Sequence, residues 1–93
     1  MAHSASAPVL KASAYLADRL DRPADAVELY RAVLLANPRE WVTARYLAAD
    51  QEKLGRIDEA IATLQQALPY VPPAQAGFLR QSLSHLLDQR KTP

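Results

Sequence analysis

The sequence contains no cysteine, so neither a disulfide framework nor a thiolate metal site can form. Only two glycines occur, Gly55 and Gly77, and this scarcity excludes the glycine-rich loops that hold phosphate groups. No apolar segment is long enough to be a membrane-spanning helix or the core of a signal peptide. We therefore expect a soluble protein with no membrane insertion and no nucleotide cofactor.

Neither sign of charge is in excess, because 11 basic and 10 acidic residues leave a formal net charge of +1. A balanced charge gives no global field that would hold a nucleic acid or an anionic membrane surface, so we expect neither as a partner. The cytoplasm is favoured over the periplasm, but a domain excised from a longer protein would have lost any leader. The compartment therefore stays open.

Valine, isoleucine and aromatic residues are sparse, whereas alanine and leucine are abundant, which favours helix over strand. Prolines, Gly55 and polar turn residues divide the chain into segments in which apolar residues recur every three or four positions. We predict an all-α domain whose helices cover residues 8–20, 24–36, 39–54, 57–68 and 73–89. The short connections make neighbouring helices antiparallel.

The sequence repeats itself after 34 residues, because segment 20–38 resembles segment 54–72. Identical residues meet in five pairs: Leu20 and Leu54, Arg22 and Arg56, Ala26 and Ala60, Leu34 and Leu68, and Pro38 and Pro72. One helix hairpin per period of this size is typical of an α-solenoid. The paired alanines are expected where two helix backbones approach closely, since a larger side chain would push the hairpin open.

On these residues the sequence resembles the tetratricopeptide repeat family, whose pattern combines small residues, a turn glycine and a closing proline. In repeat 41–74 the matching residues are Leu47, Ala48, Gly55, Ile57, Ala60, Leu64, Ala67 and Pro72. Repeat 7–40 is degenerate, and Asp21 stands where the pattern has its turn glycine.

The resemblance implies one domain, residues 7–89, folded as a right-handed α-α superhelix of about five helices. A capping helix at 73–89 would follow the two repeats, with a flexible leader at 1–6 and a flexible tail at 90–93. In the last helix an unbroken period would point Gln81, Ser82 and His85 inward, at a high burial cost. We expect instead a register shifted by one residue, with inward-facing leucines at Leu79, Leu83 and Leu86.

No catalytic, metal or cofactor site is expected, and we predict that the protein is not an enzyme. His3 and His85 are far apart and lack ligand-spaced partners, and no serine lies in a nucleophile elbow. The carboxylates are expected at helix starts and outer faces, where capping and solvation account for them: Asp18, Asp21, Asp25, Glu28, Asp50, Glu52, Asp58 and Glu59.

The resemblance implies a concave groove formed by the first helix of each hairpin. Its expected side chains are Lys11, Tyr15, Asp18, Arg19, Arg45, Ala49, Glu52, Lys53 and Arg80. Lys11, Arg45 and Arg80 recur at intervals of 34 and 35, which would stack them into a positive strip suited to an acidic or C-terminal carboxylate peptide. The alternative is that these cations are only solvated on helix surfaces.

Two large apolar residues are candidate anchors. Trp41 stands at the start of the third predicted helix, where it either packs over the 37–38 turn or is exposed to a partner. Leu87, together with Phe78, borders the exposed side of the last helix and leaves an apolar rim there.

Two functions follow from this pattern. The first is a protein interaction module that binds an extended peptide or a partner helix on its concave face. The alternative is a self-assembling unit that oligomerises through an apolar edge of the first helix (Val9, Leu10 and Leu16) or of the last.

Overall fold

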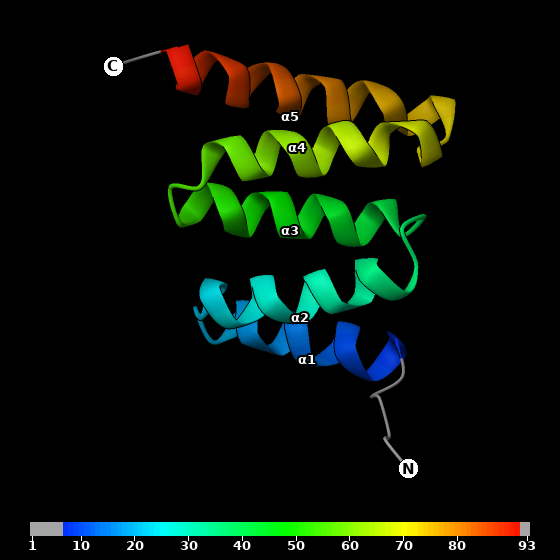
Figure 1. The fold of residues 1–93 in the computed structure, drawn as a ribbon, viewed down its shortest axis with the longest axis vertical. Helices are drawn as coiled ribbons and strands as arrows, with labels where there is room; N and C mark the ends of the chain where they lie inside the picture. Colours follow the sequence, from blue (N-terminus) through cyan, green and yellow to red (C-terminus); the bar gives the residue numbers. More distant parts are fainter. Residues whose placement is uncertain (1–6, 92–93) are drawn as a thin grey trace.

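The computed structural model describes residues 7–91, which form five α-helices and one short 3₁₀ helix (Figure 1). Their bounds are α1 Ala7–Arg19, α2 Pro23–Ala36, α3 Trp41–Lys53, α4 Ile57–Ala67, η1 Leu68–Tyr70 and α5 Pro73–Lys91. The described residues contain no strand, which confirms the all-α prediction. None of the described helices is both long and apolar enough to cross a membrane.

Successive helices run in opposite directions and stack in chain order (Figure 1). Each helix packs mainly against the helices before and after it, so α3 lies between α2 and α4. The fold measures 47 × 29 × 21 Å, and its longest axis crosses the helices instead of following them. As a result α1 and α5 are the two ends of the stack.

The turns that close α1 and α3 are equivalent. Asp21 and Gly55 both have left-handed backbone, with φ of 57° and 75°. The same backbone hydrogen bonds form at both turns, at 2.8 to 3.0 Å: Asp21 N to Asp18 O, Arg22 N to Ala17 O, Gly55 N to Glu52 O and Arg56 N to Gln51 O. This pair of bonds is the Schellman motif, which satisfies the last carbonyls of a helix. The turn geometry therefore recurs at the 34-residue period of the sequence.

The third helix is shorter than the predicted 39–54. The side chain of Asn37 accepts a hydrogen bond from Arg39 N at 3.2 Å, and its carbonyl accepts one from Glu40 N at 3.2 Å. Asparagine favours such local turns, which keep residues 37–40 out of the helix. The helix then starts at Trp41 and ends at Lys53, before the turn at Gly55.

The other differences lie at the ends of the last two helices. Pro69 ends α4 early, and the chain continues as η1. The last helix reaches Lys91, so the first two residues of the predicted tail 90–93 are helical. Residues 92–93 and the predicted leader 1–6 lie outside the described residues.

The core is built from small residues at the helix contacts and larger ones between them. Ala26 and Ala60 are each 0% exposed, as predicted for positions of close approach. Around them lie two clusters of buried side chains, and Leu34 packs against both. On α1 the buried residues are Ala14 and Ala17, and Val9, Tyr15 and Leu16 face outward.

The register of α5 is the shifted one. Leu79 and Leu86 are 1% and 2% exposed, and Leu83 packs partly buried against the same cluster. Ser82 and His85 are exposed. The prediction is confirmed, because inserting the extra Pro73 turns the helix so that its leucines, not its polar side chains, meet α4.

Candidate functional site

The predicted groove residues of α3 share one exposed side of that helix. Arg45, Ala49 and Lys53 lie one turn apart and are all exposed. A hollow of about 280 Å³ opens between α3 and α5, and its lining residues are Arg45, Tyr46, Ala48, Ala49, Glu52, Leu64, Ser82 and Leu86. Three of the predicted groove residues, Arg45, Ala49 and Glu52, therefore line one hollow.

Glu52 joins α3 to α5. Its carboxylate accepts a hydrogen bond from Gln89 Nε2 at 2.5 Å and lies 3.3 Å from His85 Nε2. Gln89 and His85 are also within 2.7 Å of each other. Glu52 thus closes one side of the hollow and is already engaged within the fold.

The predicted groove residues of α1 are engaged in two different ways. Tyr15 and Arg19 are exposed and contact each other, with the guanidinium 5.8 Å from the ring centre and donating to the hydroxyl at 3.3 Å. Lys11 instead forms an ion pair with Glu40 at 2.6 Å. This contact neutralises the first cation of the predicted positive strip. Arg80, on α5, is exposed but does not line the hollow.

The two candidate apolar anchors pack within the fold. Trp41 and Leu87 are partly buried and lie against the core cluster of α3, α4 and α5. Phe78 is 65% exposed and is the large apolar side chain that α5 presents to solvent. Tyr46, which is not among the predicted groove residues, is 48% exposed and stacks on Tyr30, with 5.9 Å between the ring centres.

The expectation that solvation accounts for all the carboxylates is wrong for Asp50. This side chain is 1% exposed, and its Oδ2 atom is buried without a hydrogen-bond partner. Asp18 on α1 has a buried unpartnered Oδ1, while its Oδ2 accepts a hydrogen bond from Tyr30 at 2.8 Å. The seam between the first and second hairpins therefore contains two carboxyl groups and two tyrosines. Helical periodicity alone did not reveal it, because Asp50 is the first residue of the polar run 50–53, which is typical of an exposed helix end.

Burial, which has the largest effect, acts together with a hydrogen bond to Asp18 and the negative charge of Asp18 to raise the pKa of Asp50 from 3.8 to about 7. Lys53 has the opposite, smaller effect on this pKa. Burial and the hydrogen bond to Asp18 also raise the pKa of Tyr30. Two ionised carboxylates cannot hydrogen-bond to each other, because neither has a proton to donate. A protonated Asp50 can donate a hydrogen bond to Asp18, so each group then has a partner.

A larger hollow lies on a different side of α3, between α2 and α4. We call this hollow the even-helix groove. It has a volume of about 1030 Å³, and its lining residues are Glu28, Arg31, Ala32, Leu34, Leu35, Pro38, Ala44, Leu47, Gln51, Glu59, Ala62, Thr63, Gln66, Ala67 and Tyr70. No sequence motif indicated it. The available signals were the small residues at Ala32 and Ala62 and the outward position of Leu35, which is 86% exposed.

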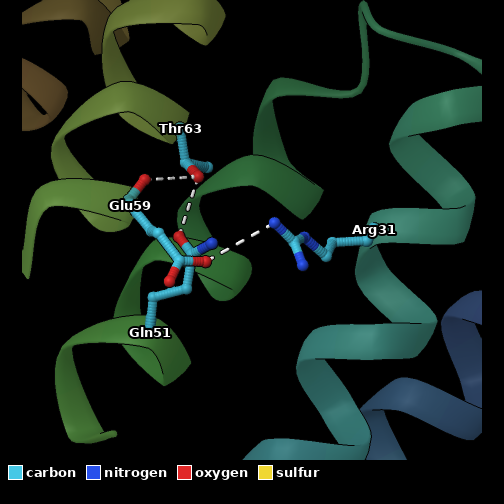
Figure 2. A network of polar contacts seen from close by, with 4 residues as sticks. All are labelled: Arg31, Gln51, Glu59 and Thr63. Carbon is cyan, nitrogen blue, oxygen red and sulfur yellow. Dashed lines mark hydrogen bonds and ion pairs between the residues drawn. The ribbon is translucent and has the colours of Figure 1, made fainter. Parts of the chain in front are cut away.

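A polar network crosses this groove (Figure 2). Arg31 on α2 donates to Glu59 on α4 at 3.4 Å, and Thr63 lies 2.7 Å from the buried amide oxygen of Gln51 on α3. Thr63 also lies 2.9 Å from the carbonyl of Glu59. A hydroxyl has one proton, so both contacts form together only when the Gln51 amide group is turned to donate to Thr63. The network ties α2, α3 and α4 together, with the buried Gln51 in the floor of the groove and the exposed Arg31 to Glu59 pair between its walls.

Within residues 7–91, no three histidine, aspartate or glutamate side chains are arranged to hold a metal ion. Each hollow is instead lined by one arginine, one tyrosine, one or two glutamates and several alanines and leucines. Comparison with protein-family models, with curated proteins and with solved structures finds no match for this chain.

Proposed function

We propose that this chain is a tetratricopeptide-like scaffold of two repeats and a capping helix, wound as a right-handed superhelix, whose function is to bind another protein. The recurrence of the same Schellman hydrogen bonds after 34 residues supports the repeat. The fully buried alanines Ala26 and Ala60, one in each repeat, support the close helix contact that the family pattern requires.

The observation that carries a binding function is a surface that we call the odd-helix face, defined by Tyr15, Arg19, Arg45, Tyr46, Ala49 and Lys53. It combines exposed cations with two half-exposed tyrosines, and three of its residues, Arg45, Tyr46 and Ala49, line the hollow between α3 and α5. Tyrosine and arginine are enriched at protein interfaces because they combine large contact area with directed polar groups.

The proposed ligand is an extended peptide with acidic side chains or a free C-terminal carboxylate. Arg45 would pair with the carboxylate, and Ala49 would let the peptide backbone approach the helix. Because the hollow holds only about 280 Å³, we expect micromolar affinity, corresponding to roughly 8 kcal/mol. Lys11 is expected to contribute less than Arg45, since Glu40 already neutralises it.

Fluorescence anisotropy with a labelled acidic peptide that ends in a free carboxylate tests this proposal. Arg45→Glu should weaken binding by about tenfold or more, because it replaces an attraction with a repulsion. Arg56→Glu is the matched control, since Arg56 is exposed at the start of α4 and does not line the hollow. Equal affinities of the wild type and Arg45→Glu would contradict the proposal.

A second candidate function, self-assembly, is favoured by one observation on α1. Val9, Leu16 and Leu20 are 54%, 57% and 59% exposed and lie at spacings of seven and four residues, so they form an apolar stripe at the end of the stack. The stripe is uncharged and can face a copy of itself, with Val9 beside Leu20 of the other copy. Sedimentation equilibrium of the wild type and Leu16→Glu tests this function, and a monomeric wild type at high micromolar concentration excludes it.

A further inference from the structure

The even-helix groove has the dimensions of a short helix. Its walls are Glu28 to Leu35 on α2 and Glu59 to Gln66 on α4, and each spans about 10 Å of helix axis. A helix with a diameter of about 10 Å and a rise of 1.5 Å fills roughly 120 Å³ per residue. The groove volume of about 1030 Å³ is therefore close to the volume of a helical segment of roughly eight residues, or two turns.

The surface of the groove suits a helix more than an extended strand. The wall residues recur at three, four and seven positions, which produces ridges that interlock with those of a third helix. Ala32, Ala44 and Ala62 have small side chains, so the backbone of a guest helix can approach the groove closely at these positions. The described residues contain no strand whose edge could pair with an extended peptide.

The two ends of the groove differ in charge and polarity. Glu28 and Glu59 lie toward the N-terminal halves of α2 and α4. Leu35, Pro38 and Tyr70 lie toward the C-terminal ends, and the Arg39 guanidinium is 6.0 Å from the centre of the Tyr70 ring. Arg31 pairs with Glu59 at the first end, so the charges of Glu28, Glu59 and Arg31 leave a net negative charge there. The other end is apolar, with a nearby cation.

This polarity fixes the direction of a guest helix. The N-terminus of a helix carries partial positive charge and its C-terminus partial negative charge. The N-terminus of the guest is expected near Glu28 and Glu59, and its C-terminus near Arg39. Such a guest runs parallel to α2 and α4 and antiparallel to α3.

From the shape, the small lining residues and the polarity of the groove, we propose that it binds a two-turn amphipathic helix of another protein, with a lysine or arginine at its N-terminal end and large apolar side chains toward its C-terminal end. The cation meets Glu28 and Glu59, and the apolar side chains cover Leu35 and Tyr70. The Arg31 to Glu59 ion pair spans the two walls and has to open when the guest helix enters, which costs little because both side chains are nearly half exposed and such pairs are weak.

The probe is a fluorescein-labelled, side-chain-stapled helical peptide of about 14 residues, with a lysine near its N-terminus and leucines at positions i, i+4 and i+7. Anisotropy titration with the full chain is expected to give a dissociation constant on the order of 10 to 100 μM. Leu35→Asp should weaken binding by about tenfold or more, because it places a charge on the apolar contact. Leu35 is 86% exposed, so the fold tolerates this change.

Three comparisons sharpen the test. Phe78→Asp is the matched control, since it makes the same kind of change at an exposed apolar residue of α5 and should leave binding unchanged. Glu28→Lys should weaken the lysine peptide several-fold and strengthen a peptide with glutamate in place of that lysine. Arg45→Glu, on the odd-helix face, should leave helix binding unchanged, so this proposal can fail or succeed independently of the acidic-peptide proposal.

A spin label at the N-terminus of the peptide tests its direction. Amide signals near Glu28 and Glu59 should broaden, and broadening confined to the Leu35 and Tyr70 end would overturn the proposed orientation. Wild-type affinity in both Leu35→Asp and Glu28→Lys, or no binding at about 1 mM peptide, would overturn the proposal itself. It would also be overturned if Leu35→Asp dissociated a dimer present without peptide, because the occupant would then be a second copy.

Discussion

The two hairpins of this protein share one turn geometry but fill it with different residues. Asp21 closes α1 and Gly55 closes α3, and both take left-handed backbone with the same hydrogen bonds. A non-glycine residue is strained there, although aspartate tolerates the conformation better than most. The requirement at this position is therefore a backbone angle, and glycine is one way of meeting it.

The hairpins differ most in what their first helices face. The second hairpin is enclosed, with α3 packed between α2 and α4. The first hairpin ends the stack, and Val9 and Leu16 on α1 and Leu20 just after it are more than half exposed. The same supersecondary unit thus presents a binding surface or a core surface according to its place in the stack.

The largest expected effect tests whether both repeats use the same close contact. Ala26→Leu and Ala60→Leu should each destabilise the fold by about 1 to 3 kcal/mol, because both sites are 0% exposed and lie between helix backbones. Chemical denaturation followed by circular dichroism measures the loss. Ala24→Leu, two residues before Ala26 but exposed, is the control. A loss at only one of the two buried sites would show that the repeats are not equivalent in packing.

The next effect concerns the seam between the hairpins. The pKa of Asp50 is about 7 in the folded state, against 3.8 ordinarily, so the folded protein binds one more proton between these pH values. The contribution of this group to stability is complete below pH 4 and is lost as the pH rises through 7, at up to about 1.4 kcal/mol per pH unit.

Asp50→Asn isolates this contribution, because asparagine keeps a donor for Asp18 without titrating. The variant should gain stability relative to the wild type as the pH rises from 5 to 8, by about 2 to 3 kcal/mol. Asp25→Asn, at an exposed position of α2, is the control. Parallel stability profiles of wild type and Asp50→Asn over this range would rule out a proton shared at the seam.

The smallest expected effect compares the two turns directly. Gly55→Ala should cost about 1 kcal/mol from backbone strain alone, since a Cβ atom there meets nothing within 4 Å. Asp21→Gly should be neutral or gain up to about 1 kcal/mol, as relief of strain is partly offset by a more flexible unfolded chain. Thermal denaturation measures both, with Asp21→Asn as a control near wild type. Effects of the same sign would show that the two turns differ in their backbone requirement.

The fold class, the five helices and the register of α5 could be predicted because they follow from periodicity, proline positions and burial of leucines. The exact start of α3 could not, since the hydrogen bonds of Asn37 compete locally with a helix that propensity would extend.

The candidate site was predicted only in part. The family resemblance placed Arg45, Ala49 and Lys53 on one groove face, and in the structure all three lie on one exposed side of α3. The ion pair of Lys11 with Glu40 and the buried pair of Asp18 and Asp50 join residues 29 and 32 positions apart in sequence, so they depend on how whole helices pack. The even-helix groove was missed for the same reason, because it is a space between α2 and α4 and no single segment encodes it.

The central functional claim is that the odd-helix face binds an acidic peptide, and an NMR titration of isotope-labelled protein tests it most directly. Peptide addition should shift the amide signals of residues 45–53 on α3 and of Ser82 on α5, and these shifts should weaken in Arg45→Glu. The absence of saturable shifts at about 1 mM peptide, or shifts confined to Leu35 and Tyr70 in the even-helix groove, would contradict it.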